Sequence, residues 1–361
     1  MMKLLEAPPT SAFSALLQGL IKPSLFSLIV TCLAALAITG NFLSFAKPEF
    51  IANHSEFLAT YDGDDDMHIT ATVLNLQLEE APPPSIYIVG DSALREVILE
   101  TNLTLNLQQS DKNFRIVDLR SGRQSLLESL AIIDNIKDDA QGLIILGVSA
   151  RSLIISKEIF DSAASGKRRG FTSKAVAEFL TKENQKSFKI TGIYGLDNIH
   201  FLLPRYLRLK FKRNRKKIQR VTHQHKDQIP MSPDNVAVAS KRYLQYLFGT
   251  TGDYESNAER GLAILNTIDK TIKRKKNLSL LLVEKPLNPL LVENYLEHDF
   301  IKNYRNQMKA LSNSIGADYL IPAENFKLSP LDFADLVHVT GGTTANQYTS
   351  LIAEYLLNEL K

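Results

Sequence analysis

Short apolar runs, separated by longer stretches with helical periodicity, dominate the chain after residue 84. Runs of this length without polar alternation are typical of strands that a parallel sheet buries on both faces. Strands that alternate with helices predict an α/β fold, a three-layer α/β/α sandwich with a mostly parallel sheet. The predicted strands cover residues 85–90, 114–120, 142–148, 278–284 and 317–322, and the predicted helices lie near residue 94 and at about 124–136, 303–314 and 344–360.

A long apolar segment near the N-terminus, residues 24–46, contains no charged residue and is about as long as a helix needs to cross a bilayer. Lys3 and Lys22 precede it, and acidic residues dominate the stretch that follows. The positive-inside bias therefore favours a cytoplasmic segment 1–23 and an extracytoplasmic remainder. The apolar run is longer than a typical signal-peptide core, and no small-x-small cleavage site follows it. We predict an uncleaved single-pass anchor; a cleaved signal and a buried hairpin are the alternatives.

Residues 47–84 have the pattern of a stalk or linker between this anchor and the α/β domain. They include an acidic turn at 62–66, an alternating segment at 68–78 that predicts a short strand, and three consecutive prolines that stiffen the chain. The α/β domain is predicted to extend over residues 85–361. Residues 149–276 separate the third and fourth strands and are too many for a plain connection, so we expect a helical insertion there, acting as a cap or a membrane-facing subdomain.

The composition, 44% hydrophobic and 22% charged, is that of a globular protein and argues against disorder over most of the chain. Cys32 is the only cysteine, so no intrachain disulfide can form.

The net charge of +3 conceals a basic run at 205–226, which holds ten Lys and Arg and no acidic residue; without it the chain carries −7. Such a run, interleaved with apolar residues, predicts contact with anionic lipid or another polyanion. A solvated helix face is the alternative, and an extracytoplasmic location argues against nucleic acid. The candidate contact residues are Arg205, Arg208, Lys210, Lys212, Arg213, Arg215, Lys216 and Lys217.

A serine follows the first predicted strand, in the sequence Gly90-Asp91-Ser92 just before a predicted helix. In parallel α/β sheets, ligands bind beyond the carboxyl ends of the strands. The backbone N–H groups and the dipole of a helix N-terminus stabilise an anion there. Ser92 is therefore a candidate nucleophile. The alternative is an ordinary helix cap, since Asp and Ser are common N-cap residues.

Asp335 and His338 stand three positions apart, before the last predicted helix. That spacing lets the carboxylate reach Nδ1 of the imidazole and leaves Nε2 free to face a serine hydroxyl. A serine is a poor nucleophile until such a base takes its proton, so the sequence predicts Ser92, His338 and Asp335 as a catalytic triad. Asp332 is an alternative partner for His338, at a less suitable spacing.

The order of these motifs, G-D-S closing the first strand and D-x-x-H before the final helix, resembles the SGNH hydrolase (GDSL-like) superfamily over residues 85–361. The resemblance implies the flavodoxin-like fold of that superfamily, with Ser92 as the nucleophile and Asp335 and His338 completing the triad. It also implies that the N–H groups of Ser92 and Gly122 contribute to the oxyanion hole, Gly122 standing at the glycine of the family's second motif block.

The third motif block departs from the family pattern, because Ser149 stands where the family has the Asn that completes the oxyanion hole. A serine hydroxyl can donate a hydrogen bond, but it is shorter and less fixed. This departure leaves an alternative open, in which a catalytically degenerate SGNH-like domain serves as a binding or assembly subunit of an envelope acylation system.

The combination of anchor, stalk, G-D-S and D-x-x-H is similar to the membrane-anchored envelope branch of the superfamily, which includes the D-alanyl transfer protein and alginate O-acetylation proteins. The resemblance implies a serine esterase or O-acyltransferase that acts on acyl esters of cell-envelope glycans. It further implies a location in the bacterial inner membrane with the catalytic domain in the periplasm.

Arg123 and Gln124 follow Gly122 and are candidate substrate-binding residues, an exposed turn being the alternative. Serine chemistry of this kind needs no metal and no organic cofactor. The expected partners are membrane lipid, an acylated glycan or other envelope ester, and a membrane-bound acyltransferase, with no nucleic acid among them.

Overall fold

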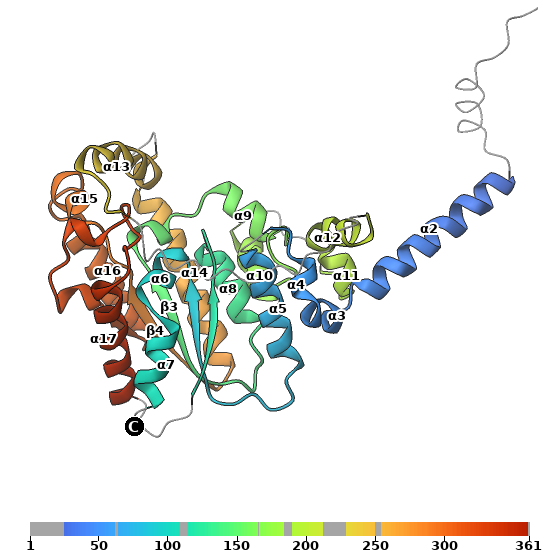
Figure 1. Cartoon of the computed structure of the whole chain (residues 1–361), viewed down its shortest axis with the longest axis horizontal. Coiled ribbons are helices and arrows are strands. Elements are labelled where there is room, and N and C mark those ends of the chain that lie inside the picture. Colours follow the sequence, from blue (N-terminus) through green and yellow to red (C-terminus); the bar gives the residue numbers. More distant parts are fainter. Residues whose placement is uncertain are drawn as a thin grey trace, which may run out of the picture. The chain divides into compact units, whose positions relative to one another are not determined.

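The computed structural model describes residues 25–61, 64–108, 114–164, 166–183, 190–211, 229–249 and 254–359. In these ranges the chain is an α/β protein with one five-stranded, all-parallel sheet and sixteen α-helices (Figure 1). The chain divides into two units, residues 1–47 and residues 48–361, and the sheet belongs to the second unit.

The sheet carries the strands that the sequence predicts, in the order β2-β1-β3-β4-β5. Their bounds are Ser85–Gly90 (β1), Arg115–Arg120 (β2), Gln141–Val148 (β3), Asn277–Glu284 (β4) and Asp318–Leu320 (β5). The chain moves from β1 to one neighbour, β2, and then crosses to the other, β3. The strand order therefore reverses beside β1, and in open parallel sheets this is where ligands bind, beyond the carboxyl ends of the strands.

Two apolar cores lie on the two faces of the sheet. Successive side chains of a strand point to opposite faces, so Tyr87 and Val89 enter one core while Ile86 and Ile88 enter the other. The first core also receives apolar side chains from α5, α8, α10, α14 and α16. The second receives them from α6, α7 and α17, and α7 and α17 pack side by side (Figure 1).

In the described residues, six helices lie between residue 48 and β3 in the chain: α3 (Pro48–Asn53), α4 (Ser55–Leu58), α5 (Asp65–Leu78), α6 (Ser92–Val97), α7 (Glu100–Gln108) and α8 (Leu126–Asp134). The helices of the C-terminal part are α15 (Pro289–Asn294), α16 (Phe300–Ile315) and α17 (Thr343–Glu359), with short 3₁₀ helices η2 (Pro322–Glu324) and η3 (Pro330–Asp332).

The described parts of the connection between β3 and β4 are mainly helical, as the sequence predicts. It contains η1 (Ala150–Leu153), α9 (Lys157–Ala164), α10 (Lys174–Lys182), α11 (Tyr194–Asp197), α12 (Ile199–Phe211), α13 (Pro233–Phe248) and α14 (Tyr254–Arg274). The long helix α14 returns the chain to the sheet and packs on α8. The insertion is therefore built into the core of the domain, because Ile264, Leu265 and Ile268 of α14 are fully buried.

The expected stalk at 47–84 and the expected strand at 68–78 are both wrong. Residues 65–78 form helix α5, whose Ile69, Val73 and Leu76 lie one turn apart and enter the first core. Asp64 caps this helix by accepting from the Met67 N–H at 3.0 Å, and acidic residues fill the first turn, where the helix dipole favours them. The alternation of polar and apolar residues that suggested a strand changes phase at Val73, so no single strand face could be buried.

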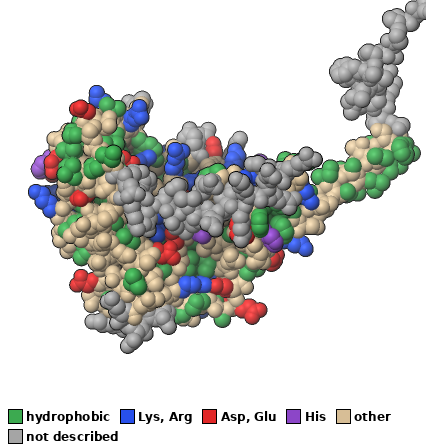
Figure 2. Space-filling view, in the orientation of Figure 1, with side chains coloured by type: hydrophobic (Ala, Val, Ile, Leu, Met, Phe, Trp, Pro, Cys, Tyr) green, Lys and Arg blue, Asp and Glu red, His purple; other side chains and the backbone are tan. Residues whose placement is uncertain are grey.

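Helix α2 (Leu25–Phe45) coincides with the apolar segment of the N-terminal unit. It is 21 residues long with a mean hydropathy of 2.0 over its most apolar window, which makes it long and apolar enough to span a membrane. Its large hydrophobic side chains from Leu25 to Ile38 are exposed, whereas Phe42 and Phe45 in the last turn are buried (Figure 2). Exposed apolar groups on every side of a helix are costly in water and favourable in lipid.

Candidate active site

The turn after β1 leaves the Ser92 hydroxyl free of helix capping. Asp91, in an extended conformation, is the N-cap of α6, and its carboxylate accepts from the Leu94 N–H. Ser92 is the first residue of the helix, so its own backbone N–H has no partner within the helix. Leu94 packs where a side chain on Gly147 would stand, so the glycine in β3 gives this turn its room. The capping alternative for Ser92 is therefore wrong; the capping residue is its neighbour.

His338 and Asp335 lie in a compact loop between η3 and α17. Phe333 and Val339 form an antiparallel bridge, and the Ala334 N–H donates to the His338 carbonyl at 2.8 Å, so the loop is closed on itself. One oxygen of Asp335 accepts the N–H groups of Val337 and His338, each at 2.8 Å. These backbone bonds fix the carboxylate before it meets the imidazole.

The structure brings Ser92, His338 and Asp335 into hydrogen-bonding distance of one another, although 246 positions separate the serine from the histidine. The Ser92 Oγ lies 2.9 Å from Nε2 of His338, and Nδ1 of the same ring lies 2.7 Å from Oδ2 of Asp335. A carboxylate at Nδ1 selects the tautomer that carries its proton there and leaves Nε2 able to accept from the serine. Asp332, the alternative partner, instead accepts from the Ser329 N–H.

The electrostatics of the pair follow from burial and mutual contact. Burial alone would lower the pKa of His338, but the hydrogen bond and charge of Asp335, followed by the charges of Glu96 and Asp91, outweigh it and raise this pKa above 6.5. Burial acts to raise the pKa of Asp335, but the hydrogen bond and charge of His338 hold it below its usual value. The imidazole therefore binds a proton more tightly than a free histidine does.

Lys285 forms an ion pair with Asp91 in the turn that carries Ser92, a contact that was not predicted from the sequence. It follows β4 directly, is 5% exposed, and its ammonium lies 2.6 Å from the Asp91 carboxylate. Burial acts to raise the pKa of Asp91, but the charge and hydrogen bond of Lys285 lower it. The signal in the sequence was a lysine at the carboxyl end of a buried strand, where a cation without a partner would be costly.

Glu96, one turn beyond Ser92, is a second acidic group near the imidazole. It is 5% exposed, and burial raises its pKa from 4.5 to about 8, although the positive charge of His338 acts in the opposite direction. It is one of the buried residues of the short helix α6.

The loop after β2 carries Gly122, and its N–H is already occupied. It donates to Oδ2 of Asp65 at 3.0 Å, and the same oxygen lies 2.8 Å from the guanidinium of Arg95. The acidic first turn of α5 therefore docks on the loop that was predicted to supply an oxyanion donor.

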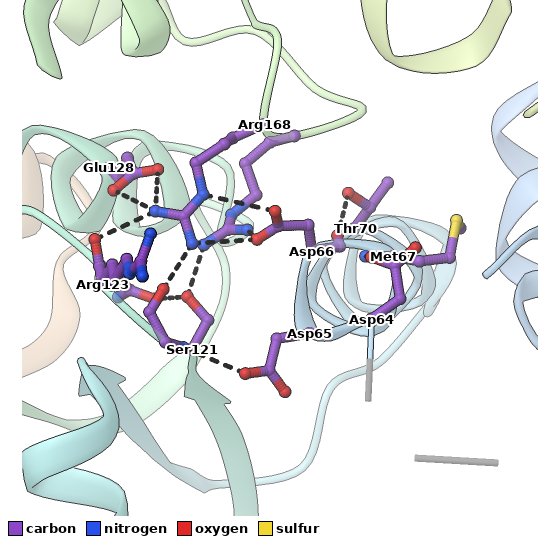
Figure 3. A network of polar contacts seen from close by, with 12 residues as sticks. Asp64, Asp65, Asp66, Met67, Thr70, Ser121, Arg123, Glu128 and Arg168 are labelled. Atoms are coloured by element: carbon purple, nitrogen blue, oxygen red, sulfur yellow. Dashed lines mark hydrogen bonds and ion pairs between the residues drawn. The ribbon is translucent and has the colours of Figure 1, made fainter. Parts of the chain in front are cut away.

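Two arginines of the insertion complete this network (Figure 3). Arg168 forms ion pairs with Asp66 at 3.2 Å and with Glu128 at 2.8 Å, and it also donates to the Gly122 and Arg123 carbonyls. Arg169 is buried, pairs with Asp66, and donates to the Ser121 hydroxyl at 2.6 Å. Burial lowers the pKa of Arg169 to about 10, which leaves it charged at neutral pH.

Gln124 is a buried link inside the protein. Its amide lies between the hydroxyls of Ser121 at 2.9 Å and Ser129 at 3.2 Å. With the amide turned so that every contact is satisfied, its oxygen accepts from the Gly90 N–H at 3.1 Å. Gln124 thus ties the β2 loop to the nucleophile turn, whereas the neighbouring Arg123 is exposed.

Ser149, the position where the resemblance expects an Asn, is the N-cap of η1. Its hydroxyl accepts from the Ser152 N–H at 3.3 Å, and its own N–H donates to the Ser152 hydroxyl at 2.7 Å. Ser149 is 5% exposed, and among the described residues of this segment it is Ser152 and Arg151 that line the cavity beside the triad.

The cavity has a volume of about 670 Å³, within the range of small-molecule sites. Residues after β1, β2 and β3 line it, together with Val337 and His338. The insertion supplies the facing wall through Ile154, Ser162 and Tyr246. The cavity therefore lies where the strand order reverses and has the Ser92 and His338 side chains in its lining.

The basic run is described only as far as residue 211. Arg205 pairs with the buried Asp64 at 3.0 Å, and Arg208 donates to the Ala59 carbonyl at 2.7 Å, so both guanidinium groups bind the α4–α5 segment of the same unit. The side chain of Lys210 approaches the ring of Tyr206. The remaining candidate contacts, Lys212, Arg213, Arg215, Lys216 and Lys217, lie outside the described residues.

No protein-family model matches this chain, and no curated protein matches it significantly.

Proposed function

We propose that this protein is a serine ester hydrolase or O-acyltransferase of the SGNH type. The observation that carries the proposal is the hydrogen-bonded series from Ser92 Oγ through the His338 ring to the Asp335 carboxylate, at 2.9 and 2.7 Å. Its position beyond the carboxyl end of β1, beside a cavity, is where a ligand would meet it. The parallel sheet with strand order 2-1-3-4-5 agrees with the three-layer, flavodoxin-like arrangement that the resemblance implies.

In the proposed reaction Ser92 Oγ attacks the ester carbonyl carbon while its proton passes to Nε2 of His338. The resulting imidazolium, stabilised by Asp335, then gives that proton to the departing alkoxide as the carbon–oxygen bond breaks. The acyl group remains on Ser92 until water or a second hydroxyl attacks it, with His338 again as the base. The proton finally returns to Ser92 Oγ, so no external proton or cofactor is consumed.

The oxyanion of each tetrahedral intermediate needs donors near Ser92. The Ser92 N–H at the start of α6 is one, since it has no partner within the helix. The Gly122 N–H becomes a second only when it leaves the Asp65 carboxylate.

Helix α2 supports a membrane location for this activity. An apolar helix of 21 residues at the N-terminus suits a single-pass anchor. With the N-terminal lysines in the cytoplasm, the α/β unit would lie outside it, in the periplasm of a bacterial envelope. The substrates expected there are acyl esters of cell-envelope glycans.

A labelling experiment tests the enzyme. The full-length protein in detergent is treated with a fluorophosphonate probe, which reacts with activated serines, and hydrolysis of 4-nitrophenyl acetate is followed in parallel. We expect labelling and turnover in the wild type and in the exposed Ser350→Ala control. Ser92→Ala should lose both, and equal labelling of Ser92→Ala and wild type would exclude Ser92 as the nucleophile.

The second candidate is a binding or assembly subunit without catalysis. It is favoured by the Gly122 N–H, an expected oxyanion donor that instead binds Asp65, and by Ser149, which is 5% exposed and is not among the described residues that line the cavity. An unlabelled wild type that still binds acylated glycan would support this candidate over the enzyme.

A further inference from the structure

The cavity beside the triad contains more positive charge than its acidic residues neutralise. Four arginines line it, Arg95, Arg123, Arg151 and Arg168, against two acidic side chains, Asp91 and Glu128.

Most of these charges have partners in the fold. Arg95 pairs with Asp65, and Asp91 pairs with Lys285. Arg168 pairs with Glu128 and also with Asp66. Both acidic groups of the lining are therefore already used, and neither is available to the other two arginines.

Arg151 and Arg123 remain. Among the side chains that the structure describes, no carboxylate lies within ion-pair distance of either guanidinium. Arg151 is instead held over two aromatic rings of the insertion, with its guanidinium carbon 4.8 Å from the ring centre of Tyr246 and 5.9 Å from that of Tyr243. Stacking on aromatic faces fixes the plane of a guanidinium while leaving its N–H donors available for an oxyanion.

Arg123 occupies a conformation that a side chain rarely adopts. Its φ is +59°, in the left-handed region, although glycine would fit there without strain. The contacts of Arg168 with the carbonyls of Gly122 and Arg123 maintain this turn. The backbone conformation at this position is one that favours glycine, yet the residue there is an arginine.

The strand order places the two arginines on either side of the nucleophile. Arg123 follows β2 and Arg151 follows β3, while Ser92 follows β1, which lies between them in the sheet. Ser92, Arg123 and Arg151 all line the same cavity, so an ester bound at Ser92 shares that cavity with both cations.

We propose that Arg151 and Arg123 form an anion-binding subsite, and that the ester substrate carries a carboxylate or phosphate group next to the bond that is cleaved. That the bound anion is part of an ester substrate rests on the proposed function. Anion binding by the two arginines does not. Bidentate arginine contacts suit both kinds of oxyanion.

Paired esters test the charge requirement in the full-length protein in detergent. Phenyl acetate is the neutral reference; 4-acetoxybenzoate and 4-acetoxyphenyl phosphate add a carboxylate or a phosphate on the alcohol side, and monophenyl succinate adds a carboxylate on the acyl side. We expect kcat/KM to favour at least one anionic ester by about tenfold in the wild type. Arg151→Gln or Arg123→Gln should remove most of this preference, measured in each variant as the ratio of kcat/KM for the anionic ester to kcat/KM for phenyl acetate. The anionic ester that loses most identifies the group and its side.

Arg242→Gln is the matched control, because Arg242 is exposed on the same helix as Tyr243 and Tyr246 but does not line the cavity. An unchanged preference in both cavity variants, or none in the wild type, would overturn the subsite.

A binding measurement separates this inference from the proposed function. Benzoate and phenyl phosphate should raise the melting temperature of the Ser92→Ala protein, and the added Arg151→Gln substitution should abolish the rise. Binding without turnover would retain the subsite and reject the enzyme. Turnover without either charge preference or binding would retain the enzyme and reject the subsite.

Discussion

The backbone N–H of Gly122 donates to the carboxylate of Asp65 at 3.0 Å, across 57 positions of sequence. A carboxylate is the kind of acceptor that an oxyanion donor would meet in a transition state, so Asp65 competes with substrate for Gly122 if both use the same N–H.

We expect Asp65→Ala to raise kcat/KM for a neutral ester, by about tenfold, because the Gly122 N–H becomes available and a negative charge is removed. The same change should cost about 1.5–3 kcal/mol of stability, since the charge-assisted bonds to Gly122 and Arg95 are lost. Steady-state kinetics and urea denaturation measure the two effects separately.

Asp66→Ala is the control for this prediction. Asp66 lies in the same helical turn but binds Arg168 and Arg169, so its removal should lower stability without a gain in activity. A slower Asp65→Ala enzyme would instead mean that Asp65 holds the loop in its working position.

The pH dependence of the reaction should follow His338. A general base must be neutral, and Asp335 is the main group that raises the pKa of this imidazole. The rising limb of the kcat/KM profile should therefore have its midpoint above pH 6.5 in the wild type. In Asp335→Asn burial acts without its counterweight, so the midpoint should move to lower pH while the plateau falls by about 10⁴ through loss of the tautomer.

Asp332→Asn provides the comparison, because Asp332 ends η3 just before this loop and its carboxylate accepts from the Ser329 N–H instead of the His338 ring. Its midpoint should match that of the wild type, and an equal shift in both variants would show that loop disturbance, and not the Asp335 contact, controls the titration.

Removal of Lys285 should damage the nucleophile turn. Lys285→Met leaves the partly exposed Asp91 carboxylate without its partner, which we expect to cost about 1–3 kcal/mol. Activity should fall as well, because Asp91 caps the helix that begins with Ser92. The double variant Asp91→Asn/Lys285→Met removes both charges and keeps a capping side chain, so it should recover most of the stability measured by urea denaturation.

Because of Glu96, the free energy of unfolding should decrease as the pH rises into the alkaline range. Burial raises its folded pKa to about 8 from 4.5, so the folded protein holds this proton more tightly than the unfolded chain. Stability from this residue is then lost as pH rises from about 4.5 through about 8. Glu96→Gln should be more stable than the wild type at pH 9 relative to pH 6, and the exposed Glu293→Gln should show no such difference.

Much of the sheet could be predicted from the sequence, because strands such as 85–90 and 142–148 are short, nearly continuous apolar runs. Such runs are typical of parallel strands that are buried on both faces. The proximity of Ser92, His338 and Asp335 could be predicted because each half is a local motif, a serine after one strand and a carboxylate three positions before a histidine.

What could not be predicted depends on packing between distant segments. Helix α5 was mistaken for a strand, because the capping by Asp64 and the burial of Val73 are decided by the sheet that it covers. The contacts of Lys285 with Asp91 and of Gly122 with Asp65 join residues 194 and 57 positions apart, and no spacing rule connects them. Arg151 was missed for the same reason, since its aromatic partners come from the far end of the insertion.

The cavity is lined by two separate parts of the domain, the insertion between β3 and β4 and the segments outside it that carry Ser92, Gly122 and His338. In the proposed reaction the groups that move protons are Ser92 and His338, whereas the insertion contributes Arg151, Ser152, Ile154, Ile159, Ser162, Arg168 and Tyr246 to the cavity lining. Under the proposed function, substitutions in the insertion part of the lining change which ester is bound and leave the Ser92–His338–Asp335 hydrogen bonds in place.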